Sequence, residues 1–270
     1  MTRVLRVIRR TARHVEDLAR ALDPALANRV ERRTDFAHCA HPVLLLHGFF
    51  ASRRTLDVLE RRLRRDGYGA FSLHLGGLWG VWNTRGIDDL ADLVRAKVER
   101  IYARNPGLGP LTIVGHSMGG LIAAYYVKKL GGWRRAGAVV TLGSPYHGTA
   151  LAYVGLPLGV LSPSVLQLRP GSEFLSRLHD GPWPAQVRLT SIWSRRDPWA
   201  PYPTAILETH GLPQLSNVEV AGDHRAFLTR KRVYEAILGE LRAAAADPPV
   251  VRGPLTAMRG GRGAASGNAA

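Results

Sequence analysis

The chain has 270 residues, which at about 150 residues per domain suits one or two domains. Since 46% of the residues are hydrophobic and 21% are charged, the chain can bury a core, which excludes global disorder, a collagen repeat and a disulfide-stapled miniprotein. The single cysteine, Cys39, excludes an intrachain disulfide and a multi-cysteine metal site, while a net charge of +16 and a pI near 11.0 raise the question of a polyanionic partner.

The excess positive charge is carried almost entirely by arginine. These arginines are spread from Arg3 to Arg262 rather than gathered in one basic arm. A GC-rich coding sequence would also favour arginine over lysine. We therefore expect no nucleic-acid partner and interpret most of this charge as solvated surface.

Residues 1–35 predict a basic amphipathic helix, in which apolar residues alternate with arginines. Charges interrupt the segment too often for a secretory signal peptide, and no later segment has the roughly 18 consecutive apolar residues of a transmembrane helix. We expect a cytoplasmic protein. The arm either packs against the domain or a partner subunit, or lies peripherally on an anionic membrane.

From Pro42 onward, short apolar strands alternate with amphipathic helices. Strand-helix repeats with nearly all-apolar strands predict an α/β fold, in which helices cover both faces of a mostly parallel central sheet. Strands are expected at 43–46, 68–75, 111–114, 138–142, 186–193 and 218–221, and helices at about 52–65, 87–104, 118–130, near 204–209 and 225–242.

The alternation is interrupted between Pro145 and Pro184 by a segment rich in Gly, Pro, Leu and Ser. Ordinary connections run about 4 to 6 residues, so this insertion predicts a small cap or lid. The Ala/Gly/Pro-rich residues 245–270 predict a disordered tail. We thus expect a helical arm at 1–35, one α/β domain at 36–244 with a cap at about 145–185, and the tail.

A Gly-x-Ser-x-Gly motif joins the strand at 111–114 to the helix that follows it. Gly115 and Gly119 flank Ser117 and leave room for a tight, strained turn. In this strand-turn-helix context the motif predicts a nucleophile elbow, with the Ser117 hydroxyl exposed at the end of the sheet.

A serine hydroxyl is a weak nucleophile, so it needs a histidine base that a carboxylate holds in the correct tautomer. Of the ten histidines, only His210 and His224 come late enough for the chain order Ser, Asp, His. His224 follows a predicted strand, where sheet enzymes place their sites, whereas His210 precedes that strand. His224 is therefore the predicted base.

The orienting carboxylate should also follow a strand. Asp197 lies in the loop that follows the predicted strand at 186–193. The competing carboxylates are Asp223, which is adjacent to His224 and so would point elsewhere, and Glu208, on a predicted short helix. The predicted catalytic residues are thus Ser117, Asp197 and His224.

Acyl transfer also needs two N–H donors for the developing oxyanion. One is the backbone N–H of Met118, the residue after the nucleophile, and the other is that of Phe49, in the loop after the first core strand. His47 is expected to support this loop by hydrogen bonding.

The chain resembles the α/β-hydrolase superfamily, and within it bacterial serine lipases and esterases. This resemblance implies an α/β-hydrolase fold with Ser117, Asp197 and His224 as its triad. Asp223 departs from the small or apolar residue often found before the histidine, and the missing secretion signal argues against an extracellular triglyceride role. The matching segments are LLLHGF at 44–49, VGHSMGG at 114–120, TLGSPYHGT at 141–149, SRRDPWAP at 194–201 and GDH at 222–224.

Apolar residues in three regions could line an acyl pocket. These are Phe50, the loop with Trp79 and Trp82, and the insertion at 151–168. The alternative is ordinary packing of a small cap. Nothing in the sequence supports a metal ion or another cofactor.

We therefore expect a serine carboxylic-ester hydrolase acting on small-molecule or lipid acyl esters with an apolar acyl chain. A thioesterase, a lactonase or an acyltransferase would use the same triad. An alternative of another class is a non-catalytic basic module that binds membranes.

Overall fold

The computed structural model describes residues 36, 39, 41–49, 51, 53–73, 75, 84–154 and 162–246. The predicted arm at 1–35, the tail beyond 246, and Phe50, Trp79 and Trp82 lie outside these residues. None of the described helices combines the length and apolar composition that a membrane span requires. The elements are β1 (Pro42–Leu46), η2 (Arg53–Leu56), α2 (Asp57–Arg65), β2 (Gly69–Ser72), α3 (Ile87–Arg104), β3 (Leu111–His116), α4 (Met118–Lys129), η3 (Gly132–Arg134), β4 (Ala136–Leu142), α5 (Leu151–Val154), α7 (Pro163–Gln167), α8 (Glu173–His179), β5 (Arg188–Trp193), β6 (Leu215–Glu219), α9 (Ala226–Thr229) and α10 (Lys231–Ala246).

Six parallel strands form one sheet in the order β2-β1-β3-β4-β5-β6. The chain runs outward from β1 to β2 and then returns to place β3 on the other side of β1. The strand order therefore reverses between β1 and β3. In parallel sheets, a crevice opens at the carboxyl ends of the strands on either side of such a reversal, and it is there that ligands bind.

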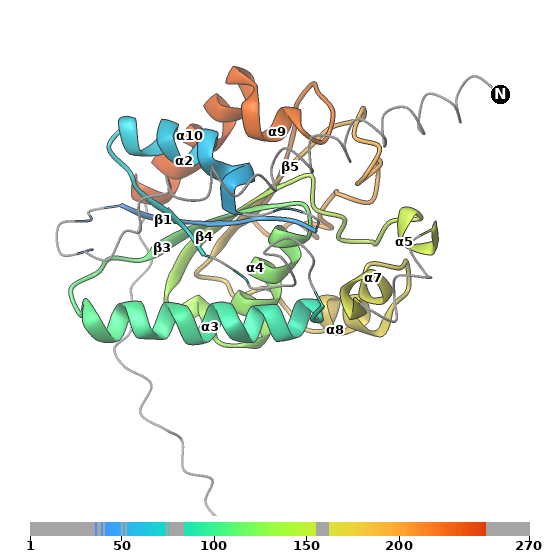
Figure 1. The fold of residues 1–270 in the computed structure, drawn as a ribbon, viewed down its shortest axis with the longest axis horizontal. Coiled ribbons are helices and arrows are strands. Elements are labelled where there is room, and N and C mark those ends of the chain that lie inside the picture. The colour runs from blue at the N-terminus through green and yellow to red at the C-terminus, as the bar shows by residue number, and fades with distance from the viewer. Residues whose placement is uncertain are drawn as a thin grey trace, which may run out of the picture.

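Helices cover both faces of this sheet, which confirms the expected architecture (Figure 1). In β1, the side chains of Leu44 and Leu46 join the core beneath α3 and α4, while Val43 and Leu45 join the core beneath α2, α9 and α10. Successive side chains of a strand point to opposite faces, so a strand that is buried on both faces must be apolar throughout. This explains the uninterrupted run PVLLL.

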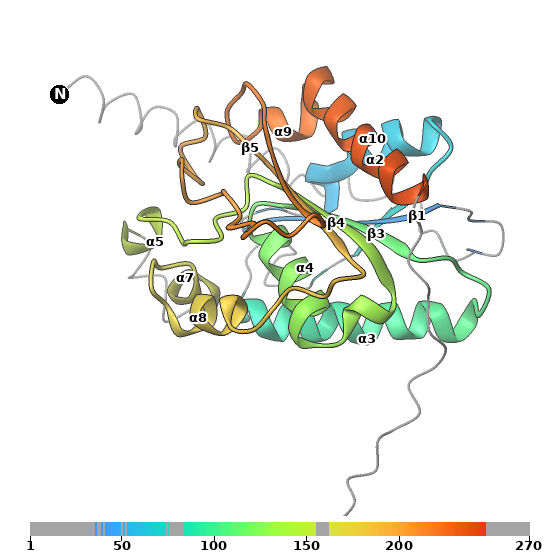
Figure 2. The same cartoon turned by 180° about the vertical axis from the view of Figure 1, so that it is seen from behind.

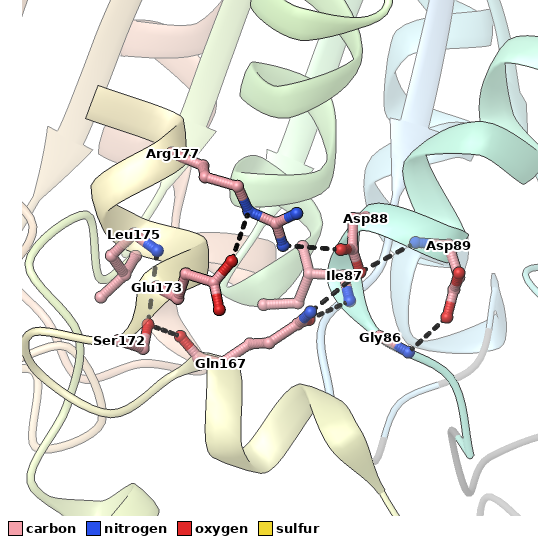
Figure 3. Close-up of polar contacts among 9 residues, drawn as sticks. All are labelled: Gly86, Ile87, Asp88, Asp89, Gln167, Ser172, Glu173, Leu175 and Arg177. Atoms are coloured by element: carbon pink, nitrogen blue, oxygen red, sulfur yellow. Dashed lines mark hydrogen bonds and ion pairs between the residues drawn. The ribbon is translucent and has the colours of Figure 1, made fainter. Parts of the chain in front are cut away.

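The insertion between β4 and β5 carries the short helices α5, α7 and α8, which Figure 2 shows at one end of the molecule. Gln167 at the end of α7 accepts a hydrogen bond from the backbone N–H of Ile87 and donates one to Oδ1 of Asp88 at 2.8 Å. Arg177 of α8 donates to Oδ2 of the same carboxylate at 2.9 Å (Figure 3). The second half of the insertion is thus fastened to the start of α3.

Two helix predictions near the C-terminus are wrong in detail. The segment near 204–209 forms turns, in which Thr204 N–H bonds to Pro201 O at 2.7 Å and Ile206 N–H to Pro203 O at 3.0 Å. Backbone groups that a helix would pair internally bond to other segments instead: Thr204 O accepts from His147 N–H at 3.0 Å, and Leu207 donates to Oδ1 of Asn217 at 2.8 Å and accepts from Nδ2 of Asn217 at 2.9 Å. The last helix is divided at Arg230, whose φ of −75° and ψ of 139° are those of extended backbone.

The Asp88 carboxylate is expected to stabilise the fold by an amount that depends on pH. Burial acts to raise its pKa, but hydrogen bonds from Gln167, backbone amides and Arg177 outweigh this effect and hold the pKa below the ordinary 3.8. Since the folded-state pKa is the lower one, Asp88 stabilises the fold above about pH 4, and this contribution disappears as the pH falls through the folded-state pKa.

We expect Asp88→Asn to lower the free energy of unfolding by about 1 kcal/mol at neutral pH, since partial exposure screens the ion pair. Urea denaturation between pH 7 and pH 3 measures this. The difference between wild type and variant should shrink below pH 4. A difference that stays constant over the whole range contradicts the assignment.

Candidate active site

Ser117 occupies a strained turn between β3 and α4. Its φ of 56° and ψ of −127° lie outside the regions that L-residues ordinarily adopt. Its N–H bonds to Leu142 O at 2.9 Å, and its carbonyl accepts from Gly120 N–H at 3.0 Å and from the buried Ser144 hydroxyl at 2.7 Å. These hydrogen bonds hold the elbow in its unfavourable conformation.

The loop after β1 packs tightly against this elbow. A Cβ atom at Gly119 would lie 2.3 Å from the carbonyl oxygen of Leu46, and one at Gly48 would lie 2.7 Å from Cβ of Ser117. Only glycine allows the two backbones to approach this closely. The contact brings the segment containing Phe49 beside the start of α4, where the first N–H groups have no intrahelical acceptor.

The predicted base and acid form a buried hydrogen-bonded pair. The Nδ1–H of His224 donates to Oδ2 of Asp197 at 2.7 Å, and both side chains are buried. The other carboxylate oxygen, Oδ1, accepts from the N–H groups of Trp199 at 2.8 Å and Ala200 at 3.2 Å. With its proton on Nδ1, a neutral His224 presents Nε2 as a proton acceptor.

His116 connects this pair to the elbow. It immediately precedes Ser117, and its Nε2 lies 3.1 Å from the carbonyl oxygen of His224. The structure thus brings together the three segments that carry the predicted catalytic residues. Ser117 follows β3, Asp197 follows β5 and His224 follows β6.

The competing titratable residues are engaged elsewhere. Asp223 accepts a hydrogen bond from the N–H of Ala226 at 3.1 Å, at the start of α9. Glu208 and His210 are exposed and pair with each other at 3.3 Å.

Two aromatic side chains beside His224 were missed by the sequence analysis. The ring of buried Phe227 lies 6.2 Å from the His224 ring, and that of half-buried Trp199 lies 6.3 Å away. Their nearness in sequence to Asp197 and His224 was the available signal. His47 bonds through Nδ1 to the carbonyl of Gly48 at 3.1 Å, consistent with the expected supporting role.

No cluster of three His, Cys, Asp or Glu side chains suited to a metal ion occurs in the part of the chain that the structure describes.

Comparison with known protein families identifies the family of this chain. A family described as serine aminopeptidase, S33, matches residues 37–198, more than half of the chain. The chain belongs to this α/β-hydrolase family. The matched region includes Ser117 and Asp197 and ends before His224. A sequence comparison with curated proteins finds no match.

Solved structures similar to this α/β-hydrolase include lipases and esterases. The mature lipase BlEst2 of Bacillus licheniformis is 16% identical with a TM-score of 0.62, and the alignment covers 78% of this chain and 96% of the lipase. Aspergillus fumigatus lipase B is 17% identical with a TM-score of 0.64, and the alignment covers 82% of this chain and 56% of that lipase. The esterase EaEST of Exiguobacterium antarcticum is 17% identical with a TM-score of 0.58, and the alignment covers 76% of this chain and 92% of the esterase. At these identities the likeness is one of fold.

The packing at Gly119 yields a stability prediction. In Gly119→Ala the new methyl group meets the carbonyl oxygens of Leu46 and His47, which are backbone atoms and cannot swing away. We expect a loss of about 1–3 kcal/mol in the free energy of unfolding. The control is Gly239→Ala on α10, where a Cβ would meet nothing within 4 Å. This change should add about 0.5–1 kcal/mol, because alanine favours helix. Equal effects in urea denaturation would contradict the close packing.

Proposed function

We propose that this α/β-hydrolase is a serine carboxylic-ester hydrolase that cleaves esters with an apolar acyl chain. Ser117 is the nucleophile, His224 the general base and Asp197 the carboxylate that orients it. The observation that carries the proposal is the buried Asp197–His224 hydrogen bond of 2.7 Å, linked through His116 to a serine held in a strained elbow.

The reaction follows from this arrangement. Ser117 Oγ attacks the ester carbonyl carbon while its proton passes to Nε2 of His224, and the carbonyl oxygen becomes an oxyanion. The N–H groups of Phe49 and Met118 stabilise that oxyanion. The bond to the alcohol oxygen then breaks, and this oxygen takes the proton from Nε2. Water repeats the sequence on the acyl-enzyme, and the acid and Ser117 are released. Throughout, Asp197 stabilises the imidazolium.

The family description names an aminopeptidase, whose substrate carries an ammonium group, so peptides with a free amino terminus are the competing substrate class. Thioesters, lactones and acyl transfer to another alcohol use the same chemistry, so a substrate panel that includes aminoacyl amides distinguishes them.

The cap is the proposed cover of the acyl chain. Its helices lie at the end of the molecule where the strands finish (Figure 1). Phe49 is half-buried and packs against the core on this side. Phe50, Trp79 and Trp82, predicted from sequence to contact the acyl chain, remain part of the proposal.

Substitution of the triad tests the proposal. Ser117→Ala should reduce kcat for p-nitrophenyl butyrate and decanoate by roughly a million-fold, and Asp197→Asn by roughly ten-thousand-fold, because the asparagine amide cannot hold the required histidine tautomer. Ser216→Ala, on the edge strand β6, is the control and should retain full activity. A fluorophosphonate should label the wild type and not Ser117→Ala. Undiminished turnover by Ser117→Ala rejects the mechanism.

Adsorption of residues 1–35 to an anionic membrane is a separate proposal, supported by the basic amphipathic pattern of that segment. Deletion of residues 1–34 should reduce binding to vesicles rich in phosphatidylserine at least ten-fold and leave turnover of p-nitrophenyl butyrate unchanged. Vesicles of neutral phosphatidylcholine are the control. Equal binding of the full and shortened chains to anionic vesicles contradicts this role.

A further inference from the structure

His116 joins two segments that are distant in the chain. It is the last residue of β3, its side chain is buried, and its Nε2 lies 3.1 Å from the carbonyl oxygen of His224. A carbonyl oxygen only accepts hydrogen bonds, so Nε2 of His116 must carry the proton and donate it. This nitrogen is therefore committed as a donor and cannot take a proton from Ser117.

The two imidazoles also pack against each other. Their ring centroids are 4.5 Å apart with an angle of 47° between the planes. The ring of Phe227 lies 6.5 Å from that of His116 and 6.2 Å from that of His224. Since interiors are close-packed, neither imidazole can move far without displacing the other rings.

His224 is consequently held at two points. Asp197, from the loop after β5, binds Nδ1 and sets the rotation of the ring. His116, from the end of β3, binds the main-chain carbonyl and sets the position from which the ring projects. Consecutive Cα atoms are about 3.8 Å apart, so this second anchor is one peptide bond away from Ser117.

We propose that His116 is a positioning residue that sets the distance between the Ser117 hydroxyl and Nε2 of His224. The inference rests on the proposed function, since it assigns a task within that triad. A general base must lie within about 2.6–3.2 Å of the proton donor, and a misplacement of about 1 Å costs about 100-fold in rate. The hydrogen bond from His116 to the carbonyl of His224 resists movement of the His224 segment relative to β3 next to Ser117, where such movement would change the distance between serine and histidine.

The test compares replacements of His116 that keep or remove the donor. In His116→Gln the amide N–H can reach the position of Nε2, in His116→Asn it is too short, and His116→Leu has no donor. For p-nitrophenyl butyrate, we expect the Leu and Asn variants to lose about 10- to 100-fold in kcat with KM changed less than two-fold. The Gln variant should recover most of kcat. The rate of fluorophosphonate labelling should fall in parallel, because it uses the same serine-histidine geometry.

A matched control separates positioning from general stability. The buried Tyr102 donates its hydroxyl proton to the carbonyls of Gly109 at 2.8 Å and Arg135 at 3.1 Å, next to the amino ends of β3 and β4. Tyr102→Phe removes hydrogen bonds of the same kind far from Ser117. It should lower the thermal midpoint and leave kcat unchanged.

Wild-type kcat in His116→Leu or His116→Asn overturns the inference, as does an equal loss in the Gln and Asn variants. If the Leu variant does not fold, the comparison of Gln with Asn decides. Turnover by Ser117→Ala would instead reject the proposed function. An inactive Ser117→Ala together with a fully active His116→Leu rejects the positioning role alone.

Discussion

The strained, positive-φ main-chain conformation of Ser117 is held by hydrogen bonds that involve β4, the segment after it and α4. Such a conformation costs of order 1–3 kcal/mol, and each of these hydrogen bonds returns about 0.5–1.5 kcal/mol. The close contact of Gly119 with Leu46 adds a steric boundary on the other side. The turn is thus determined by its surroundings, and the neighbouring side chains are placed relative to a fixed serine.

The sheet order then decides which segments meet that serine. β3 lies between β1 and β4, so the loop after β1 and the Ser144 segment after β4 both border the elbow. Asp197 and the segment of His224 follow β5 and β6, farther across the sheet. Two hydrogen bonds connect these segments to the serine turn. His116 binds the main-chain carbonyl of His224, and Asp197 binds the imidazole of His224. Parallel strands make this convergence general, since all their carboxyl ends lie along one edge.

Some of the arginines fasten the fold through ion pairs. Arg135 is bound to Glu99 at 2.8 Å and Arg177 to Asp88 at 2.9 Å, so these arginines hold helices and the cap in place without adding to the net charge. Membership of a family described as serine aminopeptidases, together with a fold shared with lipases, does not determine the substrate, which depends on the residues around Ser117.

Local sequence patterns were enough to predict the helix at 87–104, the alternation of buried strands, and the strand-turn-helix order around Ser117, because periodicity and turn chemistry act between near neighbours. They failed near 204–209, where backbone groups bond to His147 and Asn217 rather than to one another, and at Arg230, where one predicted helix is two. Chain order also limited the choice of His224 and Asp197, without showing their hydrogen bond. Only the tertiary structure revealed the contact of His116 with His224, 108 residues away, because the lateral order of strands decides which loops meet.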